Sequence, residues 1–138
     1  MAYRFRRYEH GQIHDRRGHL LFEDVVRPVS FASRAQGLIG KPVLGETQAY
    51  WFDRCASVHT WGMASAIDVI YLNTSGVVIK VVSELQPFRF SAYTNVATTV
   101  ELAGGTASRR EITVGQTLVY RPLSATSHSM AKQTPIRQ

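Results

Sequence analysis

The sequence of 138 residues contains one cysteine, Cys55, so no disulfide can form within the chain. A lone cysteine fits a reducing compartment, and we therefore expect a cytoplasmic protein. No apolar run approaches the roughly 20 residues that a membrane-spanning helix needs. The N-terminal arginines are also not followed by an apolar run of signal-peptide length. These absences predict a soluble protein with no membrane partner.

The chain also lacks the motifs of several enzyme classes. It has neither G-x-x-x-x-G-K-[ST] nor G-x-G-x-x-G, so it shows no phosphate-binding loop. Cys55 and His59 stand four residues apart, but one thiol and one imidazole do not complete a metal site. The spacing of His10, His14 and His19 also suggests a metal site, although we expect that region to be loosely ordered. We therefore predict no metal site, no cofactor and no assigned catalytic residue.

Acidic residues are few. Ten Asp and Glu stand against 16 Lys and Arg, which gives a formal net charge of +6, and 13 of the basic residues are arginine. Arginine binds phosphates and carboxylates through a planar fork, so this composition permits an anionic partner. Five arginines fall in the first 17 residues. We expect a basic N-terminal arm over residues 1–18, one compact β-rich domain over 19–121 and a flexible tail over 122–138.

The hydrophobic pattern favours many short strands over helices. The clearest strands are 67–72 and 77–82, because both are rich in β-branched residues and a turn with Gly76 separates them. A short helix is expected over 30–39, and one or two helical turns within 106–111. The predicted fold class is α+β: a mostly antiparallel sheet, partly closed like a barrel, with one or two short helices. Further strands are expected at 19–26, 49–52, 88–90, 98–102 and 118–120.

One histidine and one lone carboxylate stand out in otherwise apolar segments. If residues 62–65 form a hairpin loop, His59 lies opposite Asp68, with Cβ atoms about 4.5–5.5 Å apart. The imidazole and the carboxylate could then form a hydrogen bond. The alternatives are structural: Asp68 accepts backbone N–H groups and fixes a loop, or His59 bonds to a backbone carbonyl. A buried carboxylate costs several kcal/mol unless it is paired, so Asp68 needs one of these partners.

Several motifs, taken in order, resemble one known family over residues about 29–120. This is the bacterial and archaeal family labelled domain of unknown function 192. The resemblance implies a compact, mostly antiparallel β domain with short helices, and it implies no established catalysis or ligand. The family's recurring polar residues fall here on His59, Thr60, Asp68, Arg89 and Glu101. The matching segments are Arg34–Lys41, Cys55–Met63, Ile67–Asn73, Gln86–Arg89, Val100–Ala107 and Ile112–Gln116.

The chain departs from that pattern where relatives often carry a charge. Ala64 stands where a basic residue is common, and Asn73 and Gln116 replace the usual aspartates. The absence of these charged side chains favours ligand binding over catalysis, so we predict an accessory or binding protein with a small polar pocket. Its ligand would be a small polar molecule or a protein partner. The predicted ligand-binding residues are His59, Thr60, Trp61, Met63, Asp68, Arg89 and Glu101.

Two other functions stay open at this point. The first is a small-molecule enzyme that uses His59 and Asp68 as a general-base dyad, with the Thr60 hydroxyl nearby. The second is weak binding of an anionic partner, such as nucleic acid, through the arginine-rich arm. A buried His59 would argue against the enzyme. Weaker binding of an anionic partner after deletion of residues 1–17 would favour the hypothesis that the arm binds it.

Overall fold

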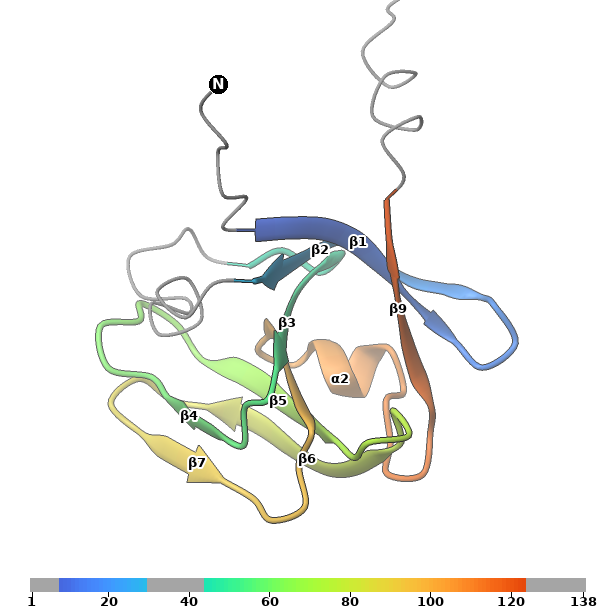
Figure 1. Cartoon of the computed structure of the whole chain (residues 1–138). Helices are drawn as coiled ribbons and strands as arrows, with labels where there is room; N and C mark the ends of the chain where they lie inside the picture. Colours follow the sequence, from blue (N-terminus) through green and yellow to red (C-terminus); the bar gives the residue numbers. More distant parts are fainter. Residues whose placement is uncertain (1–7, 30–43, 124–138) are drawn as a thin grey trace, which may run out of the picture.

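The computed structural model describes residues 8–29 and 44–123, which form nine strands and one short helix (Figure 1). Seven strands build one sheet in the order β6-β5-β8-β3-β2-β1-β9, and two build a small sheet, β4-β7. The small sheet comprises β4 (Ser57–His59) and β7 (Phe90–Ala92), and the helix is α2 (Thr106–Arg109). The strands of the large sheet are β1 (Tyr8–Asp15), β2 (Leu20–Pro28), β3 (Gln48–Asp53), β5 (Ile67–Leu72), β6 (Val78–Leu85), β8 (Thr98–Ala103) and β9 (Leu118–Pro122).

Neighbouring strands of the large sheet run antiparallel, except for β2 and β3, which are parallel. The predicted mostly antiparallel fold with a short helix is therefore confirmed. The sheet is not closed: between β6 and β9, the described residues form one isolated bridge, Val77 to Thr117. The barrel-like closure stays a prediction. The helix expected over 30–39 lies outside the described residues.

The N-terminal arm is the clearest correction to the predicted domain organisation. Residues 8–15 are not a loose arm but strand β1, which is hydrogen-bonded to β2 on one side and to β9 on the other. Ile13 is fully buried in this strand. Gly11 permits the close approach to β9, because a Cβ there would lie 2.5 Å from the carbonyl oxygen of Arg121. Histidines and a glycine interrupt the alternation that would mark this strand in the sequence.

The hairpin of β5 and β6 forms as predicted. Asn73 Oδ1 accepts hydrogen bonds from the backbone N–H groups of Ser75 and Val77. Gly76 adopts a φ of 76°, a left-handed conformation that glycine takes without a steric penalty. A side-chain acceptor and a glycine thus close the turn between the two strands.

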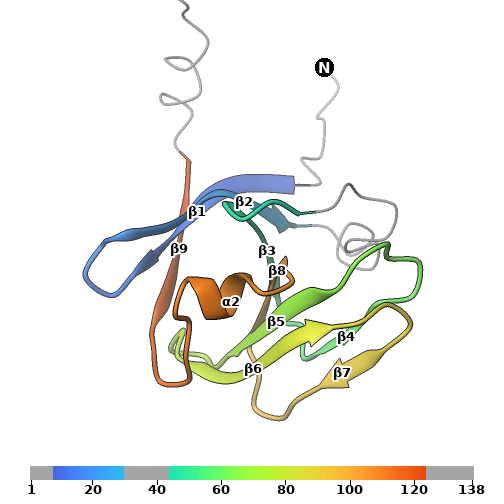
Figure 2. The same ribbon diagram turned by 180° about the vertical axis from the view of Figure 1, so that it is seen from behind.

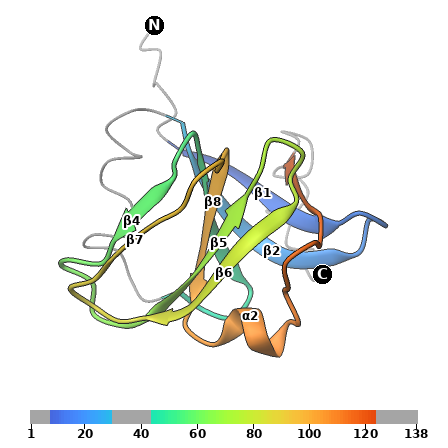
Figure 3. The same ribbon diagram turned by 90° about the horizontal axis from the view of Figure 1, so that it is seen from below.

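The large sheet buries apolar side chains on both of its faces. On one face, Ile70 and Leu102 pack in a core that includes Ala107 of α2 and Leu118 of β9. Figure 2 shows α2 between β9 and β5. On the other face, Val69 and Tyr71 pack with Val58 of β4. The small sheet therefore rests on the second face of β5, away from the β1 and β9 side of the molecule (Figure 3).

Candidate functional site

The structure separates the predicted site residues into two groups. His59, Thr60, Trp61, Met63 and Arg89 lie in or beside the small β4-β7 sheet, whereas Asp68 lies on β5 and Glu101 on β8 of the large sheet. The predicted pairing of His59 with Asp68 is wrong. His59 pairs with Phe90 of β7, and Asp68 pairs with Leu102 of β8. The general-base dyad therefore does not form.

The three cross-strand pairs of β4 and β7 turn two side chains inward and four outward. Val58 is buried, and Ser91 accepts a hydrogen bond of 2.8 Å from the Tyr71 hydroxyl beneath it. His59, which follows Val58, and Phe90, which precedes Ser91, are exposed, and the two are direct cross-strand neighbours. Side chains alternate along a strand, so the small sheet has one face on the core and one face in solvent.

Thr60 is fully buried and ties together the segments around the small sheet. Its Oγ1 donates to the carbonyl oxygen of Gln86 at 2.6 Å and accepts from the backbone N–H of Arg89 at 2.8 Å. Its own backbone N–H donates to the carbonyl oxygen of Arg89 at 2.9 Å. Thr60 thus holds the segment after β4 against the segment before β7. Met63 is half-buried and packs from the same segment against the Val58 cluster.

Replacing Thr60 with valine keeps the shape but removes the hydroxyl. The carbonyl oxygen of Gln86 and the N–H of Arg89 then lose this partner. We expect the free energy of unfolding to fall by about 1–3 kcal/mol, measured by urea denaturation. Thr60→Ser is the matched control, because it keeps the hydroxyl. If both variants lose the same stability, the hydroxyl of Thr60 does not hold the two segments together.

Exposed rings lie on the outer side of the small sheet and in the segments beside it, and we call them the aromatic face: His59, Trp61, Phe88 and Phe90. Trp61 is 63% exposed, Phe88 72% and Phe90 67%. The rings of His59 and Trp61 lie with centroids 6.3 Å apart. Large apolar side chains gathered in solvent mark an interaction surface more often than scattered ones do. Phe88 and Phe90 are not among the site residues predicted from the sequence.

The two segments that build the aromatic face carry no acidic residue. Residues 54–66 and 86–97 contain Arg54, His59 and Arg89 but neither Asp nor Glu. Arg54 and Arg89 are both exposed. A surface with cations and no carboxylates attracts anionic groups. This composition is the sequence signal that could have marked Phe88 and Phe90.

Asp68 is a structural residue. It is fully buried, and its carboxylate accepts backbone N–H bonds from Glu84 at 2.8 Å, Gly105 at 3.0 Å and Ala107 at 2.8 Å. These bonds join the end of β6 and the start of α2 to the start of β5. The structural alternative for Asp68 is thus confirmed, since it accepts backbone bonds and fixes loops.

Glu101 is the second buried carboxyl group, and its surroundings differ. It is 6% exposed, and its Oε2 has no hydrogen-bond partner among the described residues. Its cross-strand neighbours are Tyr50 of β3 and Val69 of β5. Burial raises the pKa of Glu101 to about 8, so the group is mainly protonated at neutral pH.

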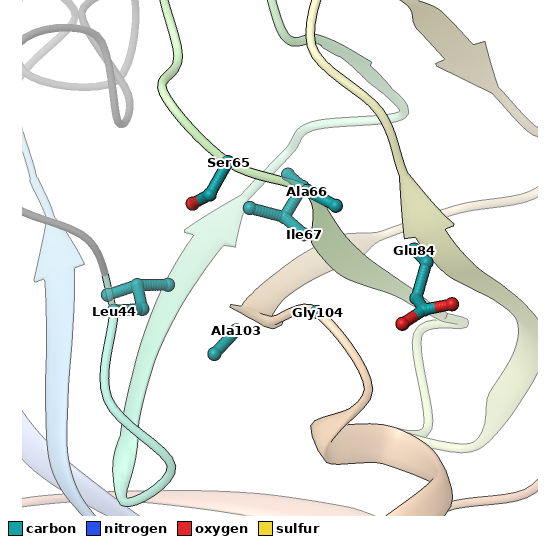
Figure 4. A pocket seen from close by; sticks show the side chains of 7 residues that line it. All are labelled: Leu44, Ser65, Ala66, Ile67, Glu84, Ala103 and Gly104. Atoms are coloured by element: carbon teal, nitrogen blue, oxygen red, sulfur yellow. The ribbon is translucent and has the colours of Figure 1, made fainter.

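A hollow of about 290 Å³ opens near one end of β5 and β8 (Figure 4). Its walls are mainly small or apolar, and the carboxyl group of Glu84 lies at its side. None of the seven predicted site residues lines it, so the small polar pocket does not form at the predicted place in the described part of the chain. The lining residues are Leu44, Ser65, Ala66, Ile67, Glu84, Ala103 and Gly104.

The comparison with protein families matches residues 15–120 to the model of DUF192, a family described as an uncharacterized ACR. The chain belongs to the DUF192 family. The match runs from the last residue of β1 into β9, so strands β2 to β8 and both buried carboxyl groups fall within it. The resemblance seen in the sequence is thereby confirmed. No curated protein matches this DUF192 chain.

Two solved structures share the fold of this DUF192 protein. A protein of unknown function from Novosphingobium aromaticivorans has a TM-score of 0.67 at 20% identity, covering 81% of this chain and 84% of the other. A protein from Sinorhizobium meliloti, called a putative transcription regulator, has a TM-score of 0.67 at 19% identity, covering 82% and 93%. At these identities the likeness concerns the fold alone.

Across residues 8–29 and 44–123, no three His, Cys, Asp or Glu side chains gather as metal ligands would. Instead, the His19 ring forms a hydrogen bond with Asp15 at 3.1 Å. Within the same ranges, no helix is long and apolar enough to span a bilayer.

Proposed function

We propose that this DUF192 protein is a non-enzymatic binding module for single-stranded nucleic acid, with the aromatic face as its binding surface. The observation that carries the proposal is the exposure of Trp61, Phe88 and Phe90 on a surface whose segments hold two arginines and no acid. Bases stack on exposed aromatic rings, and each stacked base contributes about 1–3 kcal/mol. Arg54 and Arg89 supply the attraction for phosphates.

The geometry favours a single strand over a duplex. Stacking on protein rings needs bases that are not already stacked in a helix, and single strands present such bases. The aromatic face is built on a short two-stranded sheet, with His59 and Phe90 side by side and Trp61 next to His59. The DUF192 chain has a net charge of +6, which favours any polyanion and makes binding salt-dependent.

This proposal moves the predicted anionic partner from the arm to the small sheet. The arginines of residues 1–7 lie outside the described residues, and residues 8–15 are part of the sheet. The predicted site residues His59, Trp61 and Arg89 keep a role in contact with the ligand. Thr60 and Met63 support them from below, and Asp68 is already occupied by backbone groups.

The test is a titration of labelled oligonucleotides with the full chain, read by fluorescence anisotropy. We expect oligo-dT or oligo-rU of about 20 nucleotides to bind more tightly than a duplex of equal length. Trp61→Ala and Phe90→Ala should each weaken binding about tenfold or more, because each removes a stacking ring. Comparison of the dT and rU strands tells which nucleic acid is preferred.

Val114→Ala is the matched control, because Val114 is 62% exposed but lies outside the aromatic face. Its affinity should equal that of the wild-type protein. Arg89→Gln should remove one phosphate contact and so reduce the slope of log affinity against log salt concentration by about one. If neither strand binds, or if Val114→Ala weakens binding as much as Trp61→Ala, the proposal is wrong.

A further inference from the structure

Exposed arginines gather at the turn between β1 and β2. Arg16 and Arg17 lie in this turn, and they are the two arginines of the predicted arm that the structure describes. Arg121 of β9 reaches the same turn, since a Cβ built at Gly18 would lie 4.0 Å from its Nη2 atom. All three arginine side chains are exposed. We call Arg16, Arg17 and Arg121 the arginine tip.

The arginine tip forms no ion pair within residues 8–29 and 44–123, where the ion pairs involve other arginines and His19. All ten acidic residues of the chain fall in these ranges, so no acidic side chain outside them is left to pair with the tip. Asp15 is engaged by the turn itself. Its Oδ1 accepts the backbone N–H groups of Arg17 at 2.8 Å and His19 at 2.9 Å, and its Oδ2 bonds to the His19 ring at 3.1 Å. Asp15 thus fixes the turn, and the guanidinium groups stay open to an anion.

The arginine tip and the aromatic face lie at opposite ends of the molecule. In all three views the β1–β2 turn extends beyond β9, away from β4 and β7 (Figure 1, Figure 2, Figure 3). The tip also differs in chemistry, because residues 15–20 contain no Phe, Tyr or Trp on which an unpaired base could stack. A nucleic acid that contacts both surfaces therefore meets rings at one end and guanidinium groups at the other.

We propose that the arginine tip binds the phosphates of a nucleic-acid duplex, so that the protein recognises a duplex that continues into a single strand. This inference rests on the proposed function, in which the aromatic face holds the single strand. A duplex carries one negative charge per about 1.7 Å of its axis, about twice the charge density of one strand. Guanidinium groups bind phosphate oxygens through paired N–H donors and need no unstacked base. An anionic membrane fits less well, because membrane-surface segments bury an apolar face in the lipid and residues 15–20 contain one apolar side chain, Leu20.

The experiment is a fluorescence-anisotropy titration of the full chain with three labelled probes: a blunt DNA duplex, oligo-dT, and the same duplex with a dT tail. The tail has about 30 nucleotides, because a linker that cannot span two sites gives no gain in affinity. We expect the blunt duplex to bind weakly. The tailed duplex should bind about tenfold more tightly than oligo-dT of the tail's length, because the second contact forms at a high effective concentration.

The triple variant Arg16→Gln, Arg17→Gln, Arg121→Gln should bind the blunt duplex about tenfold more weakly than the wild type, with an unchanged circular dichroism spectrum. The slope of log affinity against log salt concentration should fall by about three, one for each phosphate contact. Two single variants are matched in net charge, since Arg17→Gln removes one exposed arginine from the tip and Arg54→Gln removes one from the aromatic face. Arg17→Gln should weaken duplex binding more than oligo-dT binding, and Arg54→Gln should do the reverse.

The inference is overturned if the triple variant binds the duplex as tightly as the wild type, if the tailed duplex binds no more tightly than oligo-dT, or if the two single variants affect both probes alike. Vesicles of phosphatidylcholine and phosphatidylglycerol test the membrane: if the triple variant loses vesicle binding but not duplex binding, the partner is a lipid surface and the inference is wrong. If oligo-dT itself does not bind, the proposed function is wrong as well. If oligo-dT binds and the duplex results fail, only this inference is wrong.

Discussion

Asp68→Ala is expected to lower the free energy of unfolding by about 3–5 kcal/mol. The variant leaves the backbone N–H groups of Glu84, Gly105 and Ala107 without their acceptor. One of these residues holds a backbone conformation that side-chain-bearing residues rarely adopt, since φ is 50° at Glu84. Strained conformations persist only where the surroundings hold them, and here the carboxylate does so. Urea denaturation monitored by circular dichroism measures the loss.

Asp68→Asn separates geometry from charge. Its single carbonyl oxygen can replace Oδ1, which serves Glu84 and Gly105, but its amide nitrogen would then face the N–H of Ala107. We expect Asn to recover part of the loss seen with Ala. Domains of this size have about 5–15 kcal/mol of stability in total, so the alanine variant should be close to unfolding. A loss below about 1 kcal/mol for Asp68→Ala would show that the three bonds do not hold this part of the fold.

Glu101 is expected to make the stability of the protein fall as the pH rises. Burial raises its pKa in the folded chain to about 8, from its ordinary value of 4.5. The unfolded chain therefore loses this proton first, and between these two pH values it binds fewer protons than the folded chain. The contribution is fully present below about pH 4.5 and is lost by about pH 8. Its full size is about 5 kcal/mol, since each pKa unit corresponds to about 1.4 kcal/mol.

The comparison of wild type with Glu101→Gln isolates this effect from other titrating groups. Glutamine carries no proton that can be lost, so the stability difference between the variant and the wild type should grow in favour of the variant from pH 5 to pH 8. Urea denaturation at several pH values measures both profiles. Parallel profiles across this range would mean that Glu101 titrates normally and is not held in an apolar environment.

The strands that the sequence predicted best are those whose local pattern decides their structure. The β-branched runs of β5 and β6 form strands wherever they lie, and the Asn73–Gly76 turn joins them directly. Strand β1 has a weak pattern of its own and is held by β2 and β9, which follow later in the chain. A segment that depends on distant partners for its structure gives little local signal.

The candidate site residues also divide into those that the local sequence marks and those whose role depends on distant partners. Apolar surroundings correctly marked Asp68 as buried, but its partners lie on β6 and α2, so sequence spacing could not identify them. His59 was paired wrongly because the expected hairpin loop after Trp61 does not place β4 beside β5; β4 pairs instead with β7, some 30 residues further along. Glu101 was marked by the family resemblance alone, and its lack of a partner is visible only when β3 and β5 are in place.

Tryptophan fluorescence tests the proposed binding surface most directly. The chain has two tryptophans: Trp61 is 63% exposed on the aromatic face, and Trp51 is 8% exposed in the core. A base stacked on Trp61 should quench its emission as oligo-dT or oligo-rU is added, and Trp61→Phe should abolish the quenching while Trp51 still fluoresces. If the oligonucleotide binds and the emission of Trp61 does not change, the bases do not stack on the aromatic face.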